Sequence, residues 1–221
     1  MIKVVNAFKT YNMGNERLTV LNNVSVNIEK GEFVAIVGPS GSGKSTLMNL
    51  IGGLDTPTKG SVIIDGEDIS KLKDSKMSKF RNEKIGFVFQ SFNLEPTLTA
   101  LENIMMPMMF SGVGQKERKI QAFETLKLVD LSDRANHKPT EMSGGQKQRV
   151  SIARALVNKP KIILADEPTG NLDSKTGKNI MDILQNFKKQ GYTIVMVTHN
   201  MNEARYADRV IKIKDGLIEE A

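Results

Sequence analysis

The chain has 221 residues, a formal net charge of +6 and no cysteine. This length can bury the core of one large domain, or of a core with a subdomain. The lack of cysteine excludes disulfides and thiolate metal sites. The positive charge fits nucleic acid, an anionic membrane surface or solubility alone, so it selects no partner. The first residues lack the apolar core of a signal peptide, and no apolar run approaches the roughly 18 residues of a membrane span. We therefore expect a soluble protein of the cytosol.

Two strands are expected near the N-terminus, over residues 2–9 and 20–29, where apolar residues alternate with polar ones. A polar loop over residues 11–19 joins them, and Tyr11 is its only aromatic residue. One interpretation is that the Tyr11 ring stacks on adenine, a contact that uses the face of the ring and not its hydroxyl. The other is an ordinary half-buried tyrosine at a strand end. The sequence favours neither.

The stretch GPSGSGKST follows a short apolar strand (residues 32–37) and opens a helix (residues 44–54). Its glycines would let successive backbone N–H groups turn inward around phosphate oxygens. Lys44 would reach the β- and γ-phosphates, and the Ser45 hydroxyl would ligate Mg²⁺. The pattern predicts a nucleoside-triphosphate site. Its residues are Gly38, Pro39, Ser40, Gly41, Ser42, Gly43, Lys44, Ser45 and Thr46.

The region that follows the phosphate loop is basic and then apolar. Residues 61–69 read as a strand and turn, and the lysine-rich run over residues 70–84 is typical of a solvated helix face. Residues 91–133 have helical patterning, with a capping box at Thr99. The methionines of residues 105–109 suit a groove for a partner helix, although plain core filling is the favoured interpretation.

Four apolar runs alternate with helices, which predicts a mostly parallel sheet buried on both faces. The runs are residues 32–37, 85–89, 161–165 and 193–198. Each run is followed by polar groups: the loop from Gly38, Gln90, Asp166 with Glu167, and His199. In open α/β sheets ligands bind outside the carboxyl ends of the strands, so we expect these groups to converge on the phosphates.

The chemistry of these side chains suggests their roles. Asp166 suits the coordination sphere of Mg²⁺, and Gln90 could contact that ion or the attacking water. Glu167 could orient or deprotonate the water. His199 could donate a hydrogen bond to the γ-phosphate. The predicted catalytic residues are Glu167, His199 and Gln90, and the predicted metal ligands are Ser45, Gln90 and Asp166.

Five motifs in this order resemble the nucleotide-binding ATPase of ABC transporters: GPSGSGKS (38–45), Gln90, MSGGQ (142–146), IILADE (162–167) and His199. The resemblance covers essentially the whole chain and implies one ABC ATPase domain over residues 1–221. It implies an α/β fold with a RecA-like P-loop NTPase core, an N-terminal antiparallel β subdomain and an inserted helical subdomain. The core and β subdomain would take about residues 1–90 and 160–221, and the helical subdomain about 91–159, with the signature motif.

The signature motif has a local and a functional interpretation. Locally, Ser143 and Gln146 form a capping box at a helix start, which runs to about residue 158. Functionally, the resemblance implies that this helix start clamps the γ-phosphate of ATP held by a second subunit, in a head-to-tail homodimer with Mg²⁺. The residues implied are Ser143, Gly144, Gly145, Gln146 and, in the loop crossing the interface, Asp173. Met142 stands where the family usually has leucine.

Finer similarity points to ATPases of macrolide-exporter and lipoprotein-release type transporters, carried by residues 12–21, 87–104 and 165–174. It implies a peripheral protein on the cytoplasmic face of the cell membrane, coupled to an integral-membrane permease that exports or extrudes a drug, peptide or lipoprotein, without nucleic acid. One departure is Glu95, where an apolar residue is more common. The alternatives are the ATPase of a cell-division-type envelope complex and a soluble non-transport ABC ATPase. A DNA-repair ATPase would need a long heptad insertion, which the chain lacks.

Overall fold

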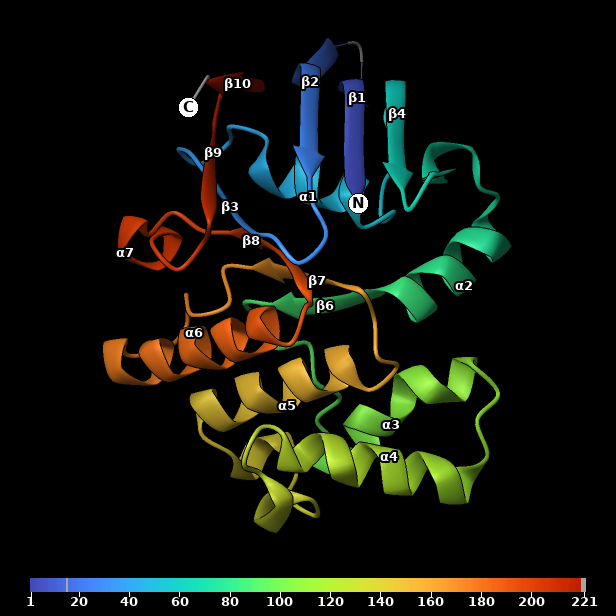
Figure 1. Cartoon of the computed structure of the whole chain (residues 1–221), viewed down its shortest axis with the longest axis vertical. Coiled ribbons are helices and arrows are strands. Elements are labelled where there is room, and N and C mark those ends of the chain that lie inside the picture. The colour runs from blue at the N-terminus through green and yellow to red at the C-terminus, as the bar shows by residue number, and fades with distance from the viewer. Residues whose placement is uncertain (15, 220–221) are drawn as a thin grey trace. The chain divides into compact units, whose positions relative to one another are not determined.

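The computed structural model describes residues 1–14 and 16–219. The chain divides into two compact units. Unit 1 combines Met1–Ser78 with the C-terminal segment from Lys188, and unit 2 is Lys79–Phe187. Figure 1 follows the chain by colour from blue to red. In the described part of the chain, none of the helices combines the length and the apolar character of a membrane span.

Unit 1 contains an antiparallel sheet with the strand order β2-β1-β4-β5. Its strands are β1 (Ile2–Met13), β2 (Glu16–Ile28), β4 (Lys59–Ile64) and β5 (Glu67–Asp68). Alternate residues of the first two strands are buried, as the pattern predicts. Both strands extend further than expected because they pair with each other almost to their shared turn. Tyr11 therefore lies in a strand opposite Leu18 and not in a loop, while Asn15 of the expected loop lies outside the described residues.

Unit 1 also contains four strands of a second sheet, in the order β10-β9-β3-β8. β3 and β8 are parallel, and every residue of both strands is buried, as the uninterrupted apolar runs predicted. The strands are β3 (Phe33–Val37), β8 (Thr193–Val197), β9 (Arg209–Lys214) and β10 (Leu217–Glu219). The helices are α1 (Lys44–Ile51), the 3-10 turn η1 (Ile69–Lys71) and α7 (Met201–Ala204).

Unit 2 combines a parallel pair of strands with helices. The strands are β6 (Ile85–Phe89) and β7 (Ile162–Asp166). The helices are α3 (Ala100–Phe110), α4 (Gln115–Lys127) and α5 (Gly144–Leu156), with the 3-10 turns η2 (Ser132–Arg134) and η3 (Pro139–Glu141). The predicted capping box is confirmed, since Thr99 Oγ1 accepts from the N–H of Glu102 and the Glu102 carboxylate accepts from the N–H of Thr99.

Two helices run across the boundaries between the units, α2 (Asp74–Lys84) and α6 (Ser174–Lys189). In α2 the residues Met77 and Phe80 are buried, whereas Lys76 and Lys79 are exposed. The basic run is therefore a solvated helix face, as expected. The helix expected over residues 175–190 is confirmed as α6, and Gly191 follows it with a positive φ of 93°.

Candidate functional site

The phosphate loop, residues 38–43, connects β3 to α1 within unit 1. Two of its glycines have no room for a side chain. A Cβ atom at Gly38 would lie 2.0 Å from the carbonyl oxygen of Ile213, and one at Gly43 would lie 2.9 Å from that of Val20. Gly43 also has a φ of 101°, which L side chains rarely adopt. Helix α1 begins directly after this glycine, which has no side chain to cap it, so the helix N-terminus is open to an anion.

Lys44 supplies positive charge at this loop. Its side chain is largely buried, and its ammonium donates a hydrogen bond of 2.7 Å to the carbonyl oxygen of Pro39. Within the described residues, the hydroxyl of Ser42 is buried and has no hydrogen-bond partner. The loop thus combines a buried cation, an unused hydroxyl and an open helix N-terminus. This combination fits a phosphate group.

Tyr11 lies in unit 1 as well, and its hydroxyl has a role that the sequence did not reveal. The hydroxyl donates a hydrogen bond of 2.7 Å to Asp55 Oδ2. Burial and the Asp55 carboxylate raise the pKa of Tyr11, so the phenol keeps the proton that it donates. The Lys9 ammonium lies 4.9 Å from the centre of the ring. That nucleotide binding uses the face of this ring stays a prediction, and the hydroxyl has its own partner within the protein.

His199 follows β8, whose last residue, Val197, pairs with Ile36 of β3. The N–H of Thr198 donates to the carbonyl oxygen of Ile36, so the chain leading to His199 runs beside the end of the strand that enters the phosphate loop. The imidazole is exposed. Unit 1 therefore brings the phosphate loop and His199, two of the four groups expected to converge, to neighbouring strand ends.

Gln90 lies in unit 2, at the end of β6, whose last residue pairs with Asp166 of β7. Its amide contacts Asn171: Gln90 Nε2 lies 3.4 Å from Asn171 Oδ1, and Asn171 Nδ2 donates to the carbonyl oxygen of Gln90 at 3.0 Å. A Cβ atom at Gly170 would lie 2.7 Å from Gln90 Nε2. The loop after β6 and the loop after β7 are therefore packed tightly against each other.

The chain turns sharply after Gln90. Phe92 and Asn93 both have positive φ, 61° and 50°, which is rare for non-glycine residues in succession. The guanidinium of Arg154, from α5, donates to the carbonyl oxygens of both residues, at 2.9 Å to that of Phe92. Burial lowers the pKa of Arg154. This side chain holds the turn that connects Gln90 to the helical segment, and the sequence reasoning missed it.

Asp166 and Glu167 end β7 in unit 2. Glu167 has a φ of 45°, so its backbone is in the left-handed region. The N–H of Gly170 donates to its carbonyl oxygen at 3.0 Å, which closes a tight turn. Left-handed non-glycine residues cluster at functional sites, and Glu167 is the expected catalytic residue of this segment.

The signature motif opens α5 in unit 2, and the predicted capping box is present. The N–H of Gln146 donates to Ser143 Oγ at 3.3 Å, and the Gln146 side chain accepts from the N–H of Ser143 at 2.9 Å. Met142 is buried, in agreement with an apolar position. A Cβ atom at Gly145 would lie 2.4 Å from Thr176 Cγ2, so this glycine is required for the packing of α5 against α6.

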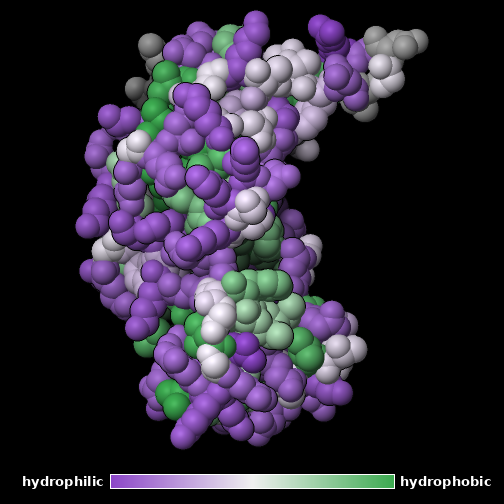
Figure 2. Space-filling model, turned by 90° about the vertical axis from the view of Figure 1, so that its right-hand side faces the viewer, coloured by the Kyte–Doolittle hydropathy of each residue, from purple (hydrophilic) through white to green (hydrophobic). Residues whose placement is uncertain are grey.

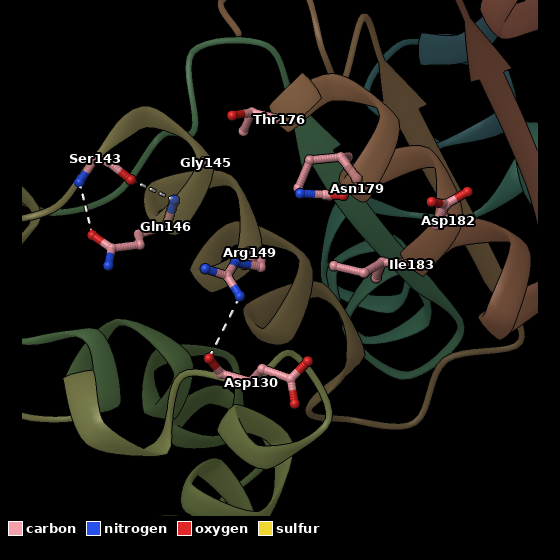
Figure 3. A pocket seen from close by; sticks show the side chains of 10 residues that line it. Asp130, Ser143, Gly145, Gln146, Arg149, Thr176, Asn179, Asp182 and Ile183 are labelled. Carbon is pink, nitrogen blue, oxygen red and sulfur yellow. Dashed lines mark hydrogen bonds between the residues drawn. The ribbon is translucent and has the colours of Figure 1, made fainter. Parts of the chain in front are cut away.

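A pocket of about 380 Å³ lies beside the signature motif (Figure 3). Arg149 projects into it from α5 and donates to the carbonyl oxygen of Asp130. The other lining residues are Ser143, Gly145, Gln146, Thr176, Asn179, Ile180, Asp182 and Ile183. Asp173 lies just before α6 and accepts hydrogen bonds from the N–H and hydroxyl of Thr176, at 3.0 and 2.6 Å. These bonds lower the pKa of Asp173 and make it the cap of that helix.

The predicted residues therefore form two groups. Unit 1 holds Tyr11, the loop residues 38–46 and His199, and unit 2 holds Gln90, Ser143 to Gln146, Asp166, Glu167 and Asp173. Four further residues contact these groups or the turn after Gln90 but were not predicted from the sequence: Lys9, Asp55, Asn171 and Arg154. Of these four, only Asn171 carried a signal, because it lies two residues before Asp173 in the loop that the family resemblance assigns to the dimer interface.

A strand, a glycine loop too tight for side chains, a buried lysine and a helix N-terminus define a P-loop nucleotide-binding protein. A family model described as "ABC transporter" matches residues 21–170, and the chain belongs to that family. It is 55% identical over 224 residues to the uncharacterized ABC transporter ATP-binding protein MJ0796 of Methanocaldococcus jannaschii, covering 99% of this chain and 95% of that protein. A solved dimer of MJ0796 in a post-hydrolysis state with ADP and Pi matches with a TM-score of 0.92 and 53% identity, covering 100% of this chain and 97% of that chain. The predicted fold class is thereby confirmed.

The chain also matches the macrolide export ATP-binding/permease protein MacB of Mannheimia succiniciproducens, with 53% identity over 217 residues. The match covers 98% of this chain and 33% of MacB. The predicted similarity to the macrolide-exporter branch is therefore confirmed.

Proposed function

We propose that this chain is the ATP-hydrolysing subunit of an ABC transporter and couples ATP-driven dimerisation to a membrane permease. The observation that carries the proposal is the phosphate loop. Its two sterically required glycines, the buried Lys44 ammonium and the uncapped start of α1 form a cradle that fits the phosphates of ATP.

The proposed nucleotide contacts are those of the sequence predictions. Tyr11 stacks on adenine, Lys44 neutralises charge on the β- and γ-phosphates, and the loop N–H groups hold their oxygens. Among the described residues, no group of three acidic, histidine or cysteine side chains is arranged to hold a metal ion. The Ser45 hydroxyl, the Gln90 amide and the Asp166 carboxylate would hold Mg²⁺ together with phosphate oxygens. The ion would neutralise charge on the transferred phosphoryl group.

Hydrolysis needs a base, a positioned water and stabilised phosphate oxygens. Glu167 orients the water and accepts its proton as the water attacks the γ-phosphorus. His199 donates a hydrogen bond to a γ-phosphate oxygen from the edge of β8. The left-handed backbone of Glu167 supports this role, because such conformations cluster at functional sites.

The active form in this proposal is a head-to-tail homodimer with two ATP molecules at its interface. Ser143, Gly144, Gly145 and Gln146 present the N-terminus of α5 to the γ-phosphate held by the partner, and Asp173 belongs to the loop at this interface. The dimer solved for MJ0796, bound to ADP and Pi, supports this arrangement.

The permease contact is placed on α3. Of the methionines in residues 105–109, Met108 is fully buried, Met105 and Met106 are half-buried, and Met109 is 57% exposed. The next residue, Phe110, is 83% exposed. Figure 2 shows apolar surface in the lower part of the molecule, on the side where Figure 1 draws the C-terminal end of α3. Core filling therefore explains Met108 alone, and an exposed apolar group remains for a partner.

The permease partner is supported by MacB, in which ATP-binding and permease parts form one protein. The chain would then work as a peripheral protein on the cytoplasmic face of the membrane. The name of this relative supports a role in export. We propose a drug, peptide or lipoprotein as the substrate that is exported or extruded.

Two variants test the proposed function. Lys44→Ala should abolish measurable ATP binding, because it removes the charge at the cradle. Glu167→Gln should bind ATP, slow its hydrolysis and accumulate the ATP-bound dimer in size-exclusion chromatography. Unchanged ATPase rates in both variants would refute the proposal.

A further inference from the structure

We propose that Lys9 and Asp55 are positioning residues that hold the Tyr11 ring at a fixed place relative to the phosphate loop. A nucleotide could then contact the ring with its base and the loop with its phosphates, without an entropic cost for ordering the ring. The inference rests on the proposed function, in which Tyr11 stacks on adenine.

The three side chains form a connected network in unit 1. The Asp55 carboxylate accepts a hydrogen bond of 2.7 Å from the Tyr11 hydroxyl through one oxygen and contacts the Lys9 ammonium through the other. The ammonium also donates 2.8 Å to the carbonyl oxygen of Thr56 and lies 4.9 Å from the centre of the Tyr11 ring. Lys9 and Tyr11 are two residues apart in β1, so their side chains leave the strand on the same face.

This network differs from an ordinary surface ion pair in its burial. The side chain of Lys9 is only 12% exposed and that of Asp55 is 28% exposed. Burial alone would raise the pKa of Asp55, but the hydrogen bonds from Lys9, Tyr11 and the N–H of Thr56 lower it overall. The carboxylate therefore stays charged and remains a strong acceptor at neutral pH.

The network ties the ring to the helix that carries the phosphate loop. Asp55 follows α1, and its N–H donates to the carbonyl oxygen of Asn49 in that helix, at 3.3 Å. In the first turn of the helix, the Thr46 side chain interacts with the Tyr11 hydroxyl and partly offsets the rise in the pKa of Tyr11. The Tyr11 hydroxyl is therefore bonded to Asp55, which follows α1 and is itself bonded to Asn49 of that helix. The ring is thereby linked to the helix that begins at the phosphate loop.

Tyr11 is 36% exposed, so a ligand can reach its ring. The Lys9 ammonium lies over the ring at cation–π distance, so it covers one face. A base can stack on the opposite face. The ammonium is held in this place by Asp55 and by the carbonyl oxygen of Thr56.

The test distinguishes the contribution of the base to binding from that of the phosphates. It compares the affinities for ADP and for inorganic pyrophosphate by isothermal titration calorimetry. The variants are Asp55→Ala, Lys9→Met and Tyr11→Phe, with Tyr11→Ala as the reference for loss of the ring. A matched control is Lys71→Met, which breaks another lysine–aspartate pair of unit 1, Lys71 to Asp68 at 2.7 Å. Each network variant should weaken ADP binding about threefold to tenfold, as expected for one hydrogen bond, and leave pyrophosphate binding unchanged.

A double variant provides the second readout. If Asp55 acts through the Tyr11 hydroxyl, the effect of Asp55→Ala on ADP affinity should largely disappear in the Tyr11→Phe background. An equal loss of pyrophosphate and ADP affinity would overturn the inference, because it would mean general damage to the phosphate loop. Normal ADP affinity in Asp55→Ala and Lys9→Met, with loss in Tyr11→Ala, would refute the positioning role and leave stacking intact. Normal affinity in Tyr11→Ala would refute the stacking itself.

Discussion

Replacing Gly145 by alanine tests whether this glycine is needed for the packing of α5 against α6, for the proposed contact with the partner's phosphate, or for both. A Cβ atom there would lie 2.4 Å from Thr176 Cγ2, whereas carbon atoms in contact are normally about 3.5–4.0 Å apart. Thr176 cannot turn away freely, because its hydroxyl donates 2.6 Å to Asp173 and its branched side chain is stiff. The variant must therefore move α5 from α6 or break this hydrogen bond.

The expected cost follows from these contacts. Overpacking costs about 1–3 kcal/mol, and alanine regains up to about 1 kcal/mol over glycine in a helix. The net destabilisation should be roughly 0.5–2.5 kcal/mol, and the melting temperature should fall by about 2–8 °C for a chain of this size. Thermal unfolding followed by circular dichroism measures this shift.

A second substitution provides the control. Thr176→Ser removes the clashing methyl group and keeps the hydroxyl that bonds Asp173. The double variant should melt within about 1–2 °C of Thr176→Ser alone, since the contact that costs free energy is gone. If Gly145→Ala melts like the native chain, or if Thr176→Ser does not restore its stability, the packing argument is wrong. A stable double variant that still lacks ATPase activity would support the second role, at the phosphate of the partner.

Three further predictions concern other parts of the chain. Glu167→Gln should lower the ATPase rate about 10²–10⁴-fold with ATP affinity retained, and a near-native rate would contradict its role as base. Arg154→Met should destabilise unit 2 by about 1–3 kcal/mol in urea denaturation, because two carbonyl oxygens lose a charged donor; an unchanged midpoint would contradict this. Burial alone would raise the pKa of Asp208, but the Phe33 N–H and the Lys188 ammonium lower it overall. Asp208 should therefore stabilise the fold above its unfolded pKa of about 4, and this stabilisation should be lost as the pH falls through the folded pKa. In a plot of melting temperature against pH, Asp208→Asn should reduce the fall at acid pH.

The sequence predicted the parts of the fold that local pattern controls. All five residues of β3 and four of the five residues of β8 are buried apolar residues, and such runs specify a strand buried on both faces. Thr99 and Ser143 start helices by capping boxes, whose chemistry lies within four residues. The phosphate loop was predicted for the same reason.

The sequence did not reveal contacts between distant segments. Tyr11 and Asp55 are 44 residues apart, and no local pattern marks either as the partner of the other. The lengths of β1 and β2 depend on their pairing with each other. This pairing continues beyond the residues in which apolar and polar side chains alternate. The packing role of Gly145 could not be predicted from local sequence, because the side chain beside it, Thr176, belongs to another helix.

The close contact between Gly170 and the Gln90 amide restricts how unit 2 can move. Because Gln90 Nε2 lies 2.7 Å from the place of a Cβ atom at Gly170, and Asn171 bonds the Gln90 carbonyl oxygen, neither loop can advance toward the other. A push on either loop must displace both together. A displacement of Gln90 by the helical segment would then pass directly to the segment from Glu167 to Asp173, because the two loops are in contact.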